Sequence, residues 1–97
     1  MRSDILVKLK KSLFLFSCFD NVYLFGSFLD SERHFQDIDV LLLYSSFSNE
    51  IPTAVIEIKQ SLESRLKYPV DITALSFEEE KNTGFLMRLN NDYLKIK

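Results

Sequence analysis

The sequence is short of the residues that would place it in several broad protein classes. Its 97 residues include one cysteine, Cys18, two glycines and two prolines. A lone cysteine excludes an intramolecular disulfide and a thiolate metal cluster, which fits a reducing compartment. So few glycines and prolines, beside 46% hydrophobic and 27% charged residues, exclude collagen-like and disordered chains. We therefore expect one folded domain over residues 1–97.

Strong net charge and long apolar runs are also missing. A formal charge of −2 gives too weak a field to gather nucleic acid or anionic membrane over the whole surface, so any nucleic-acid contact would be local. No segment approaches the roughly 18 apolar residues of a membrane-spanning helix. The apolar stretch Leu13 to Phe16 is too short for a secretion signal, and no small-residue cleavage site follows it. We expect a soluble, unprocessed cytoplasmic protein that makes no membrane contact.

Hydrophobic periodicity predicts an alternation of helices and strands. Apolar residues recur every three to four positions from Ser3 to about Ser17 and from Ile51 to Leu66, which is typical of amphipathic helices. Short β-branched and aromatic runs predict strands at residues 22–25, 38–44 and 70–75. This order predicts an α/β (α+β) fold, with a small mixed β-sheet flanked by helices.

A last helix is predicted after the third strand. Ser76 and Glu79 have the spacing of a capping box, which marks a helix N-terminus. Phe85, Leu86 and Leu89 would pack inward from this helix. Cys18 is expected to be a small buried hydrophobic residue rather than a reactive thiol.

Three acidic residues stand at the starts of predicted strands. Asp37 and Asp39 are two apart at the head of an extended run, so both carboxylates project from one face, roughly 6–7 Å apart at the backbone. Asp71 holds a similar position on the third strand. If the second and third strands are neighbours, the three like charges meet and repel one another. A divalent cation would offset that repulsion, because Mg²⁺ prefers carboxylate oxygens and completes its shell with substrate phosphates and water.

A glycine–serine pair follows the first predicted strand. Gly26 would let the backbone approach a phosphate closely, and Ser27 offers a hydroxyl and an N–H donor. Alone the pair is weak evidence, and the Asp-Ile-Asp pair could equally be a solvated strand start. The combination is more specific: Gly-Ser, nine residues, Asp-Ile-Asp opening an apolar run, and a lone Asp opening a later one.

These motifs resemble the nucleotidyltransferases of the DNA polymerase beta superfamily, in particular the minimal nucleotidyltransferases (MNT). In that family a strand ends in Gly-Ser, an Asp-x-Asp pair opens the next strand, and a third Asp comes from a later strand. Here these are Gly26-Ser27, Asp37-Ile38-Asp39 and Asp71. The resemblance covers roughly Ser3 to Leu75.

The chain departs from the family pattern just after Gly-Ser. Many members carry an Arg and a Gly there, whereas this sequence reads Phe28-Leu29-Asp30-Ser31-Glu32-Arg33. Arg33 is a candidate replacement for the usual cation, since a phosphate needs a counter-charge. Weaker nucleotide binding is the alternative. His34, in the same loop, is expected to be an ordinary exposed histidine.

The resemblance implies a nucleotidyltransferase-like fold and metal-dependent transfer of a nucleoside monophosphate, with AMP from ATP as the first candidate, to an acceptor hydroxyl. Asp37, Asp39 and Asp71 would be catalytic and would hold two Mg²⁺ ions, or Mn²⁺ in their place. Gly26, Ser27 and Arg33 would bind the ATP or another NTP.

The acceptor is not encoded in the motifs. Minimal nucleotidyltransferases commonly pair with a HEPN-type protein as toxin and antitoxin, so the resemblance implies a protein partner, and a nucleic-acid acceptor stays open. A second hypothesis is a non-catalytic subunit that binds nucleotide or a partner. The missing Arg-Gly favours this second hypothesis, and the complete set of three acidic residues favours the enzyme.

Overall fold

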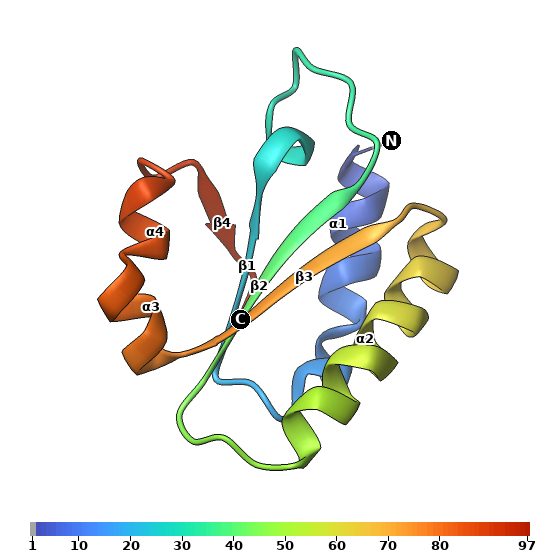
Figure 1. The fold of residues 1–97 in the computed structure, drawn as a ribbon. Coiled ribbons are helices and arrows are strands. Elements are labelled where there is room, and N and C mark those ends of the chain that lie inside the picture. The colour runs from blue at the N-terminus through green and yellow to red at the C-terminus, as the bar shows by residue number, and fades with distance from the viewer. Residues whose placement is uncertain (1) are drawn as a thin grey trace.

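A mixed β-sheet with helices on both faces forms the fold (Figure 1). The computed structural model describes residues 2–97, and within them the strand order is β3-β2-β1-β4. β1 runs antiparallel to β2 and β4, whereas β3 runs parallel to β2. The strands are β1 (Asn21–Phe25), β2 (Ile38–Tyr44), β3 (Val70–Ser76) and β4 (Tyr93–Lys95). The α/β fold class expected from the sequence is confirmed.

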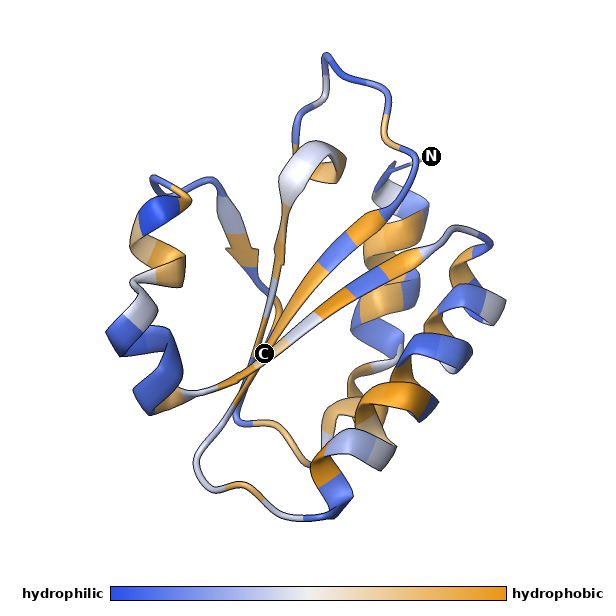
Figure 2. Cartoon of the chain, in the orientation of Figure 1, coloured by the Kyte–Doolittle hydropathy of each residue, from blue (hydrophilic) through white to orange (hydrophobic). Residues whose placement is uncertain are grey.

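Helices α1 (Arg2–Lys11) and α2 (Glu50–Leu66) cover one face of the sheet. The even-numbered residues of β1 and β2 point toward these helices, because side chains alternate along a strand. Figure 2 shows apolar residues dominating the strands and hydrophilic residues in the loop that leads to β2. The buried side chains of this face include Ile5, Leu9, Val22, Leu24, Ile38, Val40, Leu42, Ile58, Leu62 and Val70.

The helix expected over residues 3–17 is shorter than predicted. α1 ends at Lys11, and a 3₁₀ helix, η1 (Leu13–Phe16), follows it. Ser12 lies between them, buried, with its hydroxyl donating to the Lys8 carbonyl at 2.7 Å and its N–H to the Leu9 carbonyl at 3.0 Å. A serine that bonds its own backbone in this way competes with the regular helix ladder. The tighter turn buries Phe16 and leaves Phe14 exposed.

The C-terminal segment covers the second face of the sheet. The expected last helix is two short helices, α3 (Phe77–Thr83) and α4 (Phe85–Arg88), because Gly84 between them adopts φ +65°. Phe85 packs edge-on against Phe25, with ring centroids 5.4 Å apart. Leu86 and Leu89 are half-buried. β4 was not predicted, because three residues carry too little periodicity to be recognised.

Two further expectations can be compared with the structure. Cys18 is exposed, so the expectation of a buried thiol is wrong. Its neighbours Phe16 and Phe19 are the residues that face the core. None of the helices within residues 2–97 has the length and apolar character needed to cross a bilayer.

Replacing Ser76 with Ala should lower the free energy of unfolding by about 1 kcal/mol. The expected capping box is present: Ser76 Oγ accepts the Glu79 N–H at 3.0 Å, and Glu79 Oε1 accepts the Ser76 N–H at 2.9 Å. Urea denaturation measures the loss. Ser64→Ala, at an exposed position inside α2, is the control and should leave stability unchanged or slightly higher. Equal effects of the two substitutions would contradict the capping role.

Candidate metal and nucleotide site

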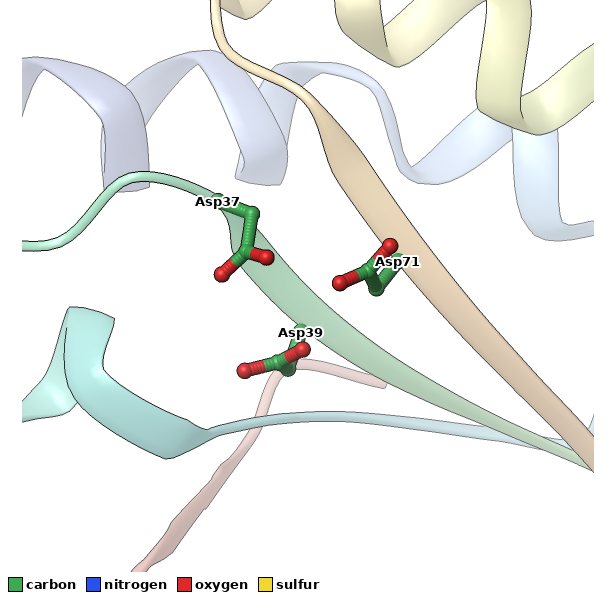
Figure 3. Close-up of side chains that lie close together, drawn as sticks. All are labelled: Asp37, Asp39 and Asp71. Atoms are coloured by element: carbon green, nitrogen blue, oxygen red, sulfur yellow. The ribbon is translucent and has the colours of Figure 1, made fainter.

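The pairing of β2 with β3 brings the three carboxylates together. Asp39 and Asp71 are register partners across the two parallel strands, and Asp37 stands one residue before β2. One oxygen from each carboxylate lies within 4.8 Å of the other two. Figure 3 shows all three side chains on the same side of the sheet. The expected convergence is therefore found, while the catalytic and metal-binding roles of these residues stay predictions.

The carboxylates oppose one another's ionisation. A hydrogen bond with Asp71, then burial and the charge of Asp71, raise the pKa of Asp37. Burial first, and then the charges of Asp37 and Asp71, raise the pKa of Asp39. A raised pKa means that the ionised form costs the folded protein free energy. A cation bound between the carboxylates would reverse that cost, and three oxygen donors fit Mg²⁺ or Mn²⁺.

Gly26 is packed directly against Asp39. It adopts φ +80°, and a Cβ atom built on it would overlap Oδ2 of Asp39 and lie 3.1 Å from Cγ. The sequence analysis explained Gly26 by a close approach of the backbone to a phosphate. The structure adds a second reason, which is close approach to the carboxylate. Ser27 follows in the 3₁₀ helix η2 (Gly26–Leu29) and is half-buried.

A cleft of about 760 Å³ opens beside Gly26, between the loop after η2 and the turn from α4 to β4. Arg33 is one of the described residues that line this cleft, and Asp37, Asp39 and Asp71 are not among them. Arg88 lines it from α4, and sequence reasoning missed this residue. Its position depends on the pairing of β4 with β1, for which the sequence carries no clear signal. The remaining lining residues are Phe25, Leu29, Asp30, Ser31, Glu32, Leu89, Asn90, Asn91, Asp92 and Tyr93.

Arg2 fixes the loop that carries Arg33. Its Nε donates to the Phe28 carbonyl at 2.8 Å, and its Nη2 donates to the carbonyls of Asp30 and Arg33. Its guanidinium also stacks over the Phe35 ring, 4.8 Å from the centroid. A guanidinium suits this role because its planar fork of donors can bind several carbonyls at once. The first residue of α1 therefore shapes one wall of the cleft.

Gly26→Ala should destabilise the protein more than Gly84→Ala and should displace the Asp39 carboxylate. Both glycines have positive φ, so both substitutions cost about 1 kcal/mol of backbone strain. Only at Gly26 does the new Cβ also meet another group, since nothing lies within 4 Å of the corresponding position at Gly84. Thermal melts of the two variants measure the difference. Equal melting temperatures would show that Gly26 and Asp39 are not in close contact.

One family model matches most of the chain. The family model described as polymerase beta, nucleotidyltransferase matches residues 7–92. No curated protein matches the chain. The structure of a tri-AMPylated HEPN toxin in complex with MNT antitoxin, from Shewanella oneidensis, has a chain that is 24% identical, with a TM-score of 0.66; the match covers 100% of this chain and 72% of that one.

A second solved structure, a toxin–antitoxin with AMP-PNP, is 23% identical with a TM-score of 0.64, over 100% of this chain and 73% of that one. At these identities the likeness shows a shared fold. The family match extends over the Gly-Ser pair and all three acidic residues. The chain therefore belongs to the polymerase beta nucleotidyltransferase family.

Proposed function

We propose that this protein is a metal-dependent nucleotidyltransferase that moves AMP from ATP to a hydroxyl group on a protein partner. The observation that carries the proposal is the carboxylate cluster of Asp37, Asp39 and Asp71, whose oxygens lie within 4.8 Å of one another. Hydrophobic packing gains nothing from placing three like charges together, whereas phosphoryl-transfer chemistry needs such a ligand set. Membership of the family supports the same reaction class.

Each site residue has a role in this reaction. Asp37 and Asp39 would hold a metal ion shared with the triphosphate, and Asp71 would help hold a second. Two bound Mg²⁺ or Mn²⁺ ions would neutralise charge on the phosphates and would make the acceptor hydroxyl more acidic. The Ser27 hydroxyl and the Gly26 backbone would donate hydrogen bonds to phosphate oxygens.

In the transfer step, the acceptor oxygen forms a bond to the α-phosphorus while the bond from that phosphorus to the bridging oxygen of the β-phosphate breaks. Pyrophosphate leaves, and the acceptor proton passes to the carboxylate of Asp71. The acceptor must lie about 3–3.5 Å from the α-phosphorus before the step. Asp71 is exposed, so an incoming hydroxyl on another molecule can reach it.

A HEPN-type protein is the proposed acceptor. One similar structure holds a HEPN toxin that carries AMP groups beside an MNT antitoxin, and another holds a toxin–antitoxin with the ATP analogue AMP-PNP. These observations concern other proteins, and we extend them to this chain as a proposal. We propose the cytoplasm as the place of the reaction. A nucleic-acid acceptor has no comparable support.

The alternative is a subunit that binds a partner or a nucleotide without turnover, and the mixed charge of the cleft favours its partner-binding form. Arg33 and Arg88 supply positive charge on its two sides, but Asp30, Glu32 and Asp92 line the same space. Three carboxylates against two guanidinium groups make a poor site for a triphosphate unless metal ions take part. The alternative is distinguished from the enzyme by turnover alone.

Asp39→Asn should raise the melting temperature of the metal-free protein and abolish its stabilisation by Mn²⁺ with ATP. The raised pKa of Asp39 means that its ionised carboxylate costs stability, and the amide removes that charge at almost the same size. Differential scanning fluorimetry measures both effects. Glu57→Gln, an exposed position on α2, is the control and should change neither. A metal-free Asp39→Asn protein that melts earlier than the wild type would make Asp39 a structural residue.

Co-expression with a HEPN-type protein encoded by a neighbouring gene, with ATP and Mg²⁺ present, should yield a complex in which the HEPN-type partner gains the mass of AMP. Asp71→Asn should remove that gain, because the acceptor hydroxyl loses its proton acceptor and one metal ligand. Intact-mass spectrometry of both complexes decides the matter. An unmodified partner in the wild-type complex would favour the non-catalytic subunit.

A further inference from the structure

Two side chains of α2 bind both backbone groups of Val70, the residue directly before Asp71. Lys59 Nζ donates to the Val70 carbonyl at 2.5 Å, and Glu63 Oε2 accepts the Val70 N–H at 2.9 Å. Lys59 and Glu63 also form an ion pair at 3.2 Å, one helical turn apart. Together they join α2 to the first residue of β3.

We call the ion pair of Lys59 and Glu63, bound to the backbone of Val70, the clamp. The position of β3 in the sheet explains why the clamp is needed. β3 is an edge strand, paired with β2 on one side only. On that side the Ile38 N–H donates to the Pro69 carbonyl at 2.9 Å. The outward N–H and C=O of an edge strand have no strand partner and otherwise face water, where strand ends open most easily. At Val70 the side chains of α2 take the place of a further strand.

The clamp acts one residue away from the carboxylate cluster. Val70 is buried toward α2, so the next side chain, that of Asp71, points to the opposite face of the sheet. There it meets Asp37 and Asp39 (Figure 3). Asp39 sits inside a central strand, whereas Asp71 sits near the end of an edge strand. Of these two register partners, Asp71 is the one that repulsion can displace most easily.

Glu63 is ionised at neutral pH, which keeps its two hydrogen bonds in place. The hydrogen bond from the Val70 N–H, and next the one from Lys59, lower the pKa of Glu63. The carboxylate therefore stays ionised at neutral pH and keeps both partners. The sequence analysis gave no role to Lys59 or Glu63.

We propose that Lys59 and Glu63 are positioning residues that hold Asp71 against its two like-charged neighbours, so that the three carboxylates can bind metal together. The part of this inference that concerns transfer rests on the proposed function. The part that concerns metal binding does not need turnover.

The test compares Glu63→Ala with the conservative Glu63→Gln. Glutamine keeps an oxygen that can accept the Val70 N–H, whereas alanine does not. Mn²⁺ affinity, measured by electron paramagnetic resonance, should fall about 10-fold in Glu63→Ala, as for other groups that orient metal ligands. It should stay within about twofold of the wild type in Glu63→Gln. Hydrogen exchange at residues 70–72 should accelerate only in the alanine variant.

Ser76→Ala, at the other end of β3, is the matched control for general loss of stability. It should lower the melting temperature and leave Mn²⁺ affinity unchanged. Unchanged Mn²⁺ affinity in Glu63→Ala would overturn the proposal, and so would an equal loss in Glu63→Gln or in Ser76→Ala. A wild-type protein that binds no Mn²⁺ would overturn it together with the metal site.

Loss of affinity confined to Glu63→Ala would support the positioning role, even if the wild type shows no AMP transfer to a HEPN-type partner. That absence of transfer would contradict the proposed function alone. The two proposals therefore fail on different measurements.

Discussion

Repulsion between three carboxylates is the constraint on which this structure depends. The parallel, in-register pairing of β2 and β3 places Asp39 beside Asp71, and the chain must hold them there at a cost in stability. Hydrophobic packing on the opposite face of the same strands holds the carboxylates in place. Ile38 and Val40, which flank Asp39, are fully buried against the helices, and each such side chain contributes about 1.5–3 kcal/mol. Apolar burial on one face thus stabilises charge on the other.

The surroundings of the carboxylates follow from the same constraint. Gly26 has no side chain because the Asp39 carboxylate occupies the space that one would fill. The edge position of Asp71 requires a clamp, which the ion pair of Lys59 and Glu63 supplies through Val70. A further cation, Arg2, fixes the loop on the far side of Gly26 through three carbonyls. Backbone groups, rather than the carboxylates themselves, receive most of this support.

The sequence was most informative where local periodicity decides the structure. The alternation of side chains along a strand is enough to put Asp37 and Asp39 on one face, and a strand, helix, strand order favours parallel neighbours, which brings in Asp71. The Ser76 capping box was readable for the same reason, since its two partners, Ser76 and Glu79, lie three residues apart and bond each other's backbone N–H. These features need no knowledge of the tertiary structure.

The features that escaped prediction depend on contacts between distant segments. β4 forms because three residues near the C-terminus pair with the free edge of β1, and the turn from α4 into this strand lies at the cleft with Arg88. Which residues after α1 are buried also depends on tertiary packing: Phe16 and Phe19 enter the core, whereas Cys18 between them is exposed. The roles of Arg2 and Glu63 could not be read either, because each acts on the backbone of a segment far away in the sequence.

The most direct test of the central claim is anomalous diffraction at the manganese edge, from crystals grown with Mn²⁺ and AMP-PNP. The account predicts manganese bound by carboxylate oxygens of Asp37, Asp39 and Asp71, at about 2.1 Å, the distance typical of such small divalent ions. The same ions should also contact phosphate oxygens of the nucleotide. Bound AMP-PNP with no manganese at these three carboxylates would contradict the account.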